Sequence, residues 1–124
     1  MAADWSQRKR SRALTREISP NFTKALASYF GTGPTDVGAS QDAHANYVTA
    51  LRENGVNVEV LPGLNDFPDC TFVEDAGVVI DDAVVIPYMG HPSRRGEQVA
   101  IRDFFGKCLE VFEMPEGAKM DGGD

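Results

Sequence analysis

The feature that most constrains the fold is a helix that leads directly into a strand. Four apolar residues recur at the spacing of one helical face: Ala43, Tyr47, Val48 and Leu51. They predict a helix over Ser40–Asn54, with Ser40 as its N-terminal cap and Gly55 in the left-handed conformation at its end. Val56–Leu61 then alternates apolar and polar residues, as a strand with one buried face does. A helix and a strand joined so closely indicate a compact α/β unit.

The same order returns in the second half of the sequence. The other predicted elements are a strand at Arg12–Ile18, a helical turn or loop at Phe22–Phe30, short strands at Cys70–Val73 and Gly77–Ile80, an Asp81-Asp82 turn, a strand at Ala83–Ile86, a helix at Arg95–Phe105 with Val99, Phe104 and Phe105 as apolar candidates, and a strand at Cys108–Glu113. The helix–strand pairs recur at a similar spacing, which favours an α/β fold of two similar modules. Residues 1–11 are expected to be a flexible, basic start before one domain over 12–124.

Charge and hydropathy narrow the possible partners. The 124 residues hold 12 Lys and Arg against 19 Asp and Glu, a net charge of −7, although five basic residues lie within the first 16. An acidic body argues against nucleic acid and suits a cationic small molecule, while it also serves solubility. The apolar runs are too short to span a membrane, and the basic start lacks the apolar stretch of a secretory signal. A cytoplasmic protein is therefore expected.

An acidic motif, Phe67–Asp75, is the first candidate for chemistry. Asp69, Glu74 and Asp75 interrupt a segment that otherwise resembles a buried strand, where unpaired charge costs free energy. One interpretation is an exposed strand end capped by turn-forming aspartate. The other is a carboxylate pocket for a cation such as a guanidinium, whose planar N–H groups suit carboxylates.

Two further segments are candidates. Gly90–Glu97 places two arginines ahead of a helix, where the helix dipole favours acids, so it is either a solvated loop or a contact for an anion. Within it, His91 is expected to be exposed. His44, in the middle of the predicted first helix, is expected to be a packing or capping histidine. Neither is expected to be a catalytic base, and neither has ligand-spaced partners for a metal. Asp121–Asp124 pairs glycines with acids, either to let backbone approach a ligand or as an ordinary loop.

In this order, the three segments closely resemble the dimethylarginine dimethylaminohydrolase family of the guanidino-group-modifying superfamily. Ser19–Leu26 is similar to that family's first ligand loop, and His44–Tyr47 with Leu51 to its first helix. The resemblance covers roughly residues 12–124 and departs at Ile86–Met89, where an arginine usually precedes the Pro-Gly turn. It implies the pentein fold, an α/β-propeller of five ββαβ-like modules around a channel. This N-terminal portion would supply about two modules.

The resemblance also implies substrate-binding roles. Asp69 is expected to hold the α-amino group of the substrate, together with the backbone carbonyl of Leu26. Glu74 and Asp75 are expected to bind the guanidinium, and Phe72 to form an apolar wall. An arginine analogue carries a cation at each end of its carbon chain, so carboxylates are the complementary groups.

The reaction is implied in the same way. Arg94 is expected to clamp the α-carboxylate, and Asp121 to orient a catalytic histidine. A cysteine thiolate attacks the guanidinium carbon of a methylated arginine, dimethylamine leaves, and water releases citrulline, without a cofactor. In the family this cysteine and histidine follow the segment 121–124, so the chain alone is expected to be inactive. Cys70 and Cys108 are expected to be free thiols without a catalytic role.

The sequence leaves three alternatives open. The chain resembles arginine deiminases and amidinotransferases of the same superfamily less closely, and substrate choice among these enzymes depends on other parts of the pocket. A non-catalytic remnant that binds arginine analogues is a third option. A homodimeric parent is also compatible with the sequence. An open pair of modules exposes strand edges and apolar surface, which predicts marginal stability.

Overall fold

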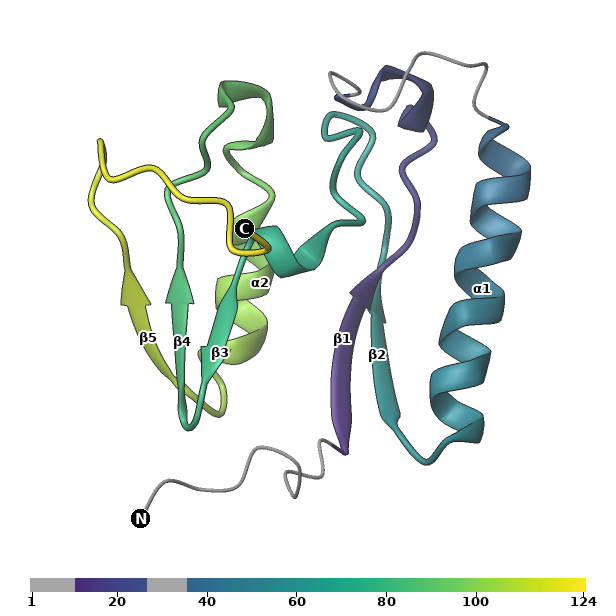
Figure 1. The fold of residues 1–124 in the computed structure, drawn as a ribbon, viewed down its shortest axis with the longest axis horizontal. Coiled ribbons are helices and arrows are strands. Elements are labelled where there is room, and N and C mark those ends of the chain that lie inside the picture. The colour runs from purple at the N-terminus through teal and green to yellow at the C-terminus, as the bar shows by residue number, and fades with distance from the viewer. Residues whose placement is uncertain (1–10, 27–35) are drawn as a thin grey trace.

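The computed structural model describes residues 11–26 and 36–124 as two α/β units (Figure 1). The elements are β1 (Arg12–Arg16), η2 (Phe22–Lys24), α1 (Val37–Glu53), β2 (Asn57–Leu61), η3 (Val73–Asp75), β3 (Val78–Ile80), β4 (Ala83–Ile86), η4 (Pro92–Arg94), α2 (Gln98–Phe105) and β5 (Glu110–Glu113), where η marks a 3₁₀ helix. The flexible start expected for residues 1–11 lies, except for Ser11, outside the described residues. So do residues 27–30 of the predicted turn at Phe22–Phe30, whose described part contains η2.

The two units share one topology. Each contains a strand, a helix and a second strand, and the two strands pair in parallel: β1 with β2, and β4 with β5. The second unit adds β3, which pairs antiparallel with β4 across the predicted turn, where Asp81 has a φ of 54°. The predicted α/β fold of two modules is confirmed. The segments after the carboxyl ends of the parallel strands gather at one end of the molecule, where open α/β sheets bind ligands (Figure 1).

Helix α1 begins earlier than predicted. Its N-terminal cap is Asp36, whose carboxylate accepts a hydrogen bond from the Ala39 N–H at 2.9 Å. Ser40, the predicted cap, lies inside the first turn, and its hydroxyl donates to the Asp36 carbonyl. The prediction was wrong because the apolar periodicity starts only at Ala43, nearly two turns after the helix begins at Val37. Gly55 follows the helix with a φ of +84°, as predicted.

The buried faces of the helices differ from the predicted ones. On α1, Val48 is buried, whereas Tyr47 is 56% exposed. On α2, Ile101 is 1% exposed and Val99 is 46% exposed, which reverses the prediction for Val99. Ile101 belongs to a core that also contains Ala76, Val84, Ile86 and Met89. No helix in the described ranges combines the length and apolar character needed to cross a membrane.

The predicted strand at Cys70–Val73 does not form. The chain makes consecutive local turns there: the Cys70 N–H donates to the Phe67 carbonyl, and the Phe72 N–H to the Asp69 carbonyl. The β-branched residues gave a misleading strand pattern because Pro68 and Asp69 start a turn instead. The motif carboxylates therefore lie on turns and on η3, and the interpretation as a strand end is wrong.

A candidate cation site where three loops meet

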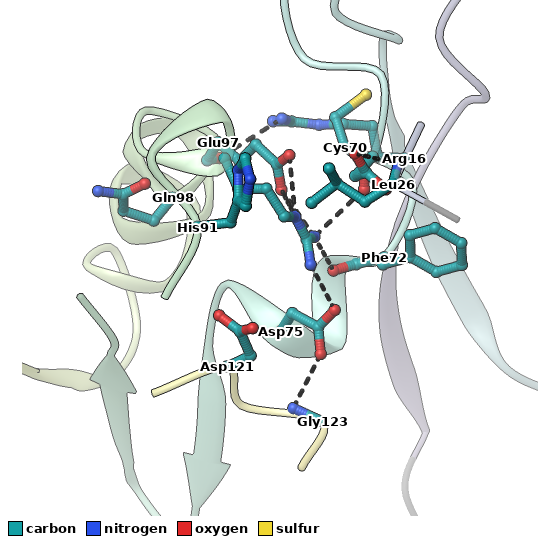
Figure 2. A network of polar contacts seen from close by, with 12 residues as sticks. Arg16, Leu26, Cys70, Phe72, Asp75, His91, Glu97, Gln98, Asp121 and Gly123 are labelled. Carbon is teal, nitrogen blue, oxygen red and sulfur yellow. Dashed lines mark hydrogen bonds and ion pairs between the residues drawn. The ribbon is translucent and has the colours of Figure 1, made fainter. Parts of the chain in front are cut away.

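The three candidate segments come together after the carboxyl ends of β2, β4 and β5. Asp121 Oδ1 accepts the Gly90 N–H at 3.0 Å, which joins the third segment to the second. Asp75 Oδ1 accepts the Gly123 N–H at 3.0 Å, which joins the third segment to the first (Figure 2). Asp75 and Asp121 are 46 positions apart in the sequence, and only the tertiary fold brings the segments that carry them together.

The paired glycines of the third segment are required by this close approach. A Cβ atom on Gly122 would lie 2.6 Å from both the Glu74 carbonyl oxygen and a Val78 methyl group. A Cβ atom on Gly123 would collide with the Asp75 carboxylate. The Gly122 N–H also donates to the Asp75 carbonyl at 2.9 Å. The backbone approach predicted for the glycines therefore occurs, but toward the acidic turn of the same chain.

Arg94 is buried at the junction of the first two segments, with 6% of the residue exposed. Its Nη1 donates to Asp75 at 2.7 Å, and its Nε and Nη2 donate to Glu97 at 3.2 and 2.8 Å. Nη2 also reaches the carbonyl oxygens of Asp69 and Phe72. Burial by itself lowers the pKa of Arg94, but the hydrogen bonds to Glu97 and Asp75 raise the pKa above its ordinary value. The interpretation of this segment as a solvated loop is wrong at Arg94.

These hydrogen bonds limit how far Arg94 can serve its expected role as a clamp on a substrate carboxylate. Most of its five N–H donors point to protein acceptors, so Arg94 organises the acidic turn in this structure. A clamp on a substrate carboxylate stays a prediction.

Two buried charged residues were missed by the sequence reasoning. Glu97 is 2% exposed, and burial raises the pKa of its carboxyl, which the hydrogen bond with Arg94 opposes only in part. Arg16, at the end of β1, is 1% exposed, and its Nη1 lies 3.5 Å from the Glu97 carbonyl oxygen. Its Nε has no hydrogen-bond partner among the described residues. The spacing of Arg94 and Glu97, three residues apart, was the available signal for the pair.

Asp69 and Leu26 meet as the resemblance implied, but through a different atom. The Leu26 N–H donates to both carboxylate oxygens of Asp69, at 3.1 and 3.2 Å. Asp69 is 5% exposed, so this contact ties the first loop to the acidic turn. The use of the Leu26 carbonyl for a ligand stays a prediction. Phe72 is 39% exposed, and its ring centre lies 6.3 Å from that of Phe22.

Glu74 is the exposed carboxylate of the motif. It borders two hollows, of about 480 and 640 Å³. The larger one lies between α1, the end of β1 and the acidic turn, and the rings of Phe22, Tyr47 and Phe72 line it. Glu74 and Asp75 are neighbours with different surroundings: Asp75 is held by Arg94, and Glu74 faces open space.

The cysteines and histidines lie as the sequence indicated. Cys70 is buried and Cys108 exposed, and both are free thiols. Burial raises the pKa of the Cys70 thiol, against weaker opposing effects of the Leu64 N–H and Arg16. His91 is exposed and caps η4 by accepting the Ser93 N–H. Within the ranges that the structure describes, no three His, Cys, Asp or Glu residues are grouped to hold a metal ion.

The two α/β units match about 45% of the pentein fold, which places the chain in that fold class. Dimethylarginine dimethylaminohydrolase from Pseudomonas aeruginosa, in a complex with citrulline, matches 92% of this chain with a TM-score of 0.87 and 26% identity. The family model for eukaryotic N,N dimethylarginine dimethylhydrolase matches residues 38–116. The chain belongs to the dimethylarginine dimethylaminohydrolase family.

Two curated relatives show how much of a longer protein this chain matches. The N(G),N(G)-dimethylarginine dimethylaminohydrolase of Streptomyces coelicolor is 31% identical over 114 residues, which are 91% of this chain and 44% of that protein. The bifunctional arginine dihydrolase/ornithine cyclodeaminase AgrE of Nostoc is 30% identical over 73 residues, which are 58% of this chain and 10% of that protein. The chain thus spans less than half the length of these relatives, and it covers 45% of the Pseudomonas structure.

Proposed function

We propose that this chain provides the cation-binding part of an amidine hydrolase site for N-methylated arginine. The observation that carries the proposal is that Asp69, Glu74 and Asp75 lie on one acidic turn at one end of the fold. Arg94 bridges the Asp69 carbonyl and the Asp75 carboxylate there, and Gly123, two residues after Asp121, contacts Asp75. Exposed Glu74 suits the guanidinium, and buried Asp69 suits the α-amino group of the same ligand. An arginine analogue carries a cation at each end of its carbon chain, for which carboxylates are the complementary groups, and carboxylate–guanidinium hydrogen bonds are directional.

The chemical step follows from the family reaction. A cysteine thiolate adds to the guanidinium carbon, dimethylamine leaves with a proton from a histidine, and water then releases citrulline and regenerates the thiolate. Asp121 would orient that histidine. Cys70 is not suited to the attack, because it is buried and its raised pKa keeps the thiol protonated. We therefore expect residues 1–124 alone to bind the substrate without turnover.

Calorimetry with asymmetric dimethylarginine tests the proposal. The half-open, solvated site should bind it with a Kd on the order of 1 mM. Asp75→Asn should weaken binding at least tenfold, because it removes a carboxylate next to the guanidinium. Glu113→Gln is the matched control, since it removes an exposed partner of Arg102 that lies outside the three segments. Equal binding by Asp75→Asn and the unaltered chain would contradict the proposal, as would citrulline release by this chain.

The relation to AgrE supports a second candidate, hydrolysis of unmethylated arginine. Arginine and dimethylarginine differ only at the guanidinium nitrogens, which Glu74 and Asp75 would face. Titrating both ligands into the same sample separates the candidates. Tighter binding of dimethylarginine favours the first candidate, and tighter binding of arginine favours the second.

A further inference from the structure

We propose that Glu97, which has no assigned role in substrate binding, is a positioning residue for the cation site. It acts through Arg94: by neutralising this buried arginine, it leaves the charge of Asp75 available to a ligand cation. The inference rests on the proposed function, because it concerns the same site. Glu97 itself is 2% exposed, and both of its carboxylate oxygens accept hydrogen bonds from Arg94.

The geometry gives Arg94 two carboxylates on different edges of its guanidinium. Glu97 occupies the edge formed by Nε and Nη2, and Asp75 takes Nη1. Because a guanidinium is planar, fixing one edge fixes the direction of the other N–H groups. Nη2 then reaches the carbonyl oxygens of Asp69 and Phe72, so the same contact also fixes the acidic turn. Figure 2 shows this network running from Glu97 through to Asp75 and Gly123.

The charges of the cluster explain why Glu97 matters to a cation. Two buried arginines, Arg16 and Arg94, lie among three carboxylates, those of Asp69, Asp75 and Glu97. The cluster therefore carries one net negative charge when all five groups are ionised. Without the charge of Glu97 it is neutral, and Asp75 becomes the sole carboxylate partner of Arg94. A guanidinium would then compete with Arg94 for Asp75 in a poorly solvated place, where such interactions are strong.

Glu97→Gln tests the inference because it keeps the shape and removes the charge. By calorimetry, we expect about a tenfold loss in affinity for asymmetric dimethylarginine and less than about a threefold loss for citrulline, whose ureido group is neutral. A residue with a merely structural role would weaken both ligands equally. Glu97→Asp, which restores the charge, should recover part of the selectivity for the cation. Glu113→Gln, which breaks an exposed Arg–Glu pair of similar length, should leave both affinities unchanged.

A double-mutant cycle identifies the path of the effect. If Glu97 acts through Arg94 on Asp75, then Glu97→Gln adds little to the loss already caused by Asp75→Asn. Additive losses would overturn the inference. If neither ligand binds the unaltered chain, the proposed function fails. If dimethylarginine binds and Glu97→Gln leaves its affinity unchanged, only the role of Glu97 fails.

If Glu97→Gln does not fold, the inference can still be tested by a measurement on the unaltered chain. The Nε–H signal of Arg94 in a nitrogen-resolved NMR spectrum should exchange slowly with water, because Glu97 holds this proton in a buried place. It should shift when acid protonates Glu97 while the chain is still folded. A rapidly exchanging signal that is insensitive to acid would overturn the inference.

Discussion

At the residue scale, the burial of Cys70 makes the stability of the fold depend on pH. Its thiol is 2% exposed and accepts the Leu64 N–H at 3.3 Å, while Cys108 lies on the surface. Burial raises the pKa of Cys70 in the folded chain above the value of about 8.5 for a free cysteine. Unfolding above that pH therefore releases a proton, so the stabilising contribution present at low pH is lost as the pH rises toward the folded pKa.

We predict that the free energy of unfolding falls between pH 8 and 10 by up to about 1.4 kcal/mol per pH unit through Cys70. Cys70→Ala should flatten this part of the curve, whereas Cys108→Ala should not, because its thiol is exposed in both states. Urea denaturation of the three proteins at each pH measures the difference. Parallel curves for Cys70→Ala and the unaltered chain would show that Cys70 does not contribute.

Gly122 is the second residue-scale case, because a Cβ atom there would lie 2.6 Å from the Glu74 carbonyl oxygen. Gly122→Ala should lower the free energy of unfolding by about 2 kcal/mol and weaken dimethylarginine binding, since the added Cβ pushes the loop away from Asp75. Gly38→Ala is the control: among the described residues its Cβ would meet only the Asp36 carboxylate, at 3.4 Å, and the change should stabilise α1 by about 0.5 kcal/mol. Urea denaturation checks both values, and a Gly122→Ala protein of unchanged stability would contradict the close contact.

At the scale of elements, the start of α1 allows a test of which residue caps the helix: Asp36, as in the structure, or Ser40, as predicted from the sequence. Asp36→Ala should lower the free energy of unfolding by about 1 kcal/mol, because the Ala39 N–H loses its acceptor. Ser40→Ala should change it by no more than about 0.3 kcal/mol, since Ser40 lies inside the helix, where Ala is favoured. Thermal unfolding of both variants tests the assignment. A larger effect at Ser40 would restore the cap predicted from the sequence.

The elements that the sequence predicted well are those whose signals are local. β1, β2, β4 and the Asp81-Asp82 turn follow from alternation and turn chemistry, and the structure confirms them. The segment Cys70–Val73 has the same β-branched composition and forms turns, because no neighbouring strand pairs with it in the described ranges. Strand propensity says which residues fit into a sheet. Whether a strand forms at a given place depends on a neighbouring strand to pair with.

At the scale of the whole molecule, the described surface exposes large apolar side chains. They are Leu26, Tyr47, Phe72, Ile80, Val99 and Phe112, exposed by 39 to 56%. In the described ranges β1 pairs only with β2, and β5 only with β4, so strand edges are open as well. Relatives of this chain are more than twice its length, which is consistent with further modules covering such surfaces in them.

We predict that the 124-residue chain binds a hydrophobic dye such as ANS and self-associates as its concentration rises, because open edges and apolar patches favour association. Ile80→Thr should reduce dye binding with little change in stability, since Ile80 is 56% exposed on an edge strand and Thr keeps the strand preference. Dye fluorescence and sedimentation measure both effects. A monomer that unfolds cooperatively and binds no dye would contradict the prediction.

The sequence by itself determined the α/β class, the two modules and the three candidate segments that the fold brings together. These depend on periodicity, turn residues and short motifs, which are local properties of the chain. Only the tertiary structure decided which charges are buried and which carboxylates meet. Arg16 and Glu97 lie 81 residues apart, and their burial at one junction depends on how β1 passes the loop after β4. Desolvation and pairing of charge arise from that crossing, and no spacing along the chain encodes it directly.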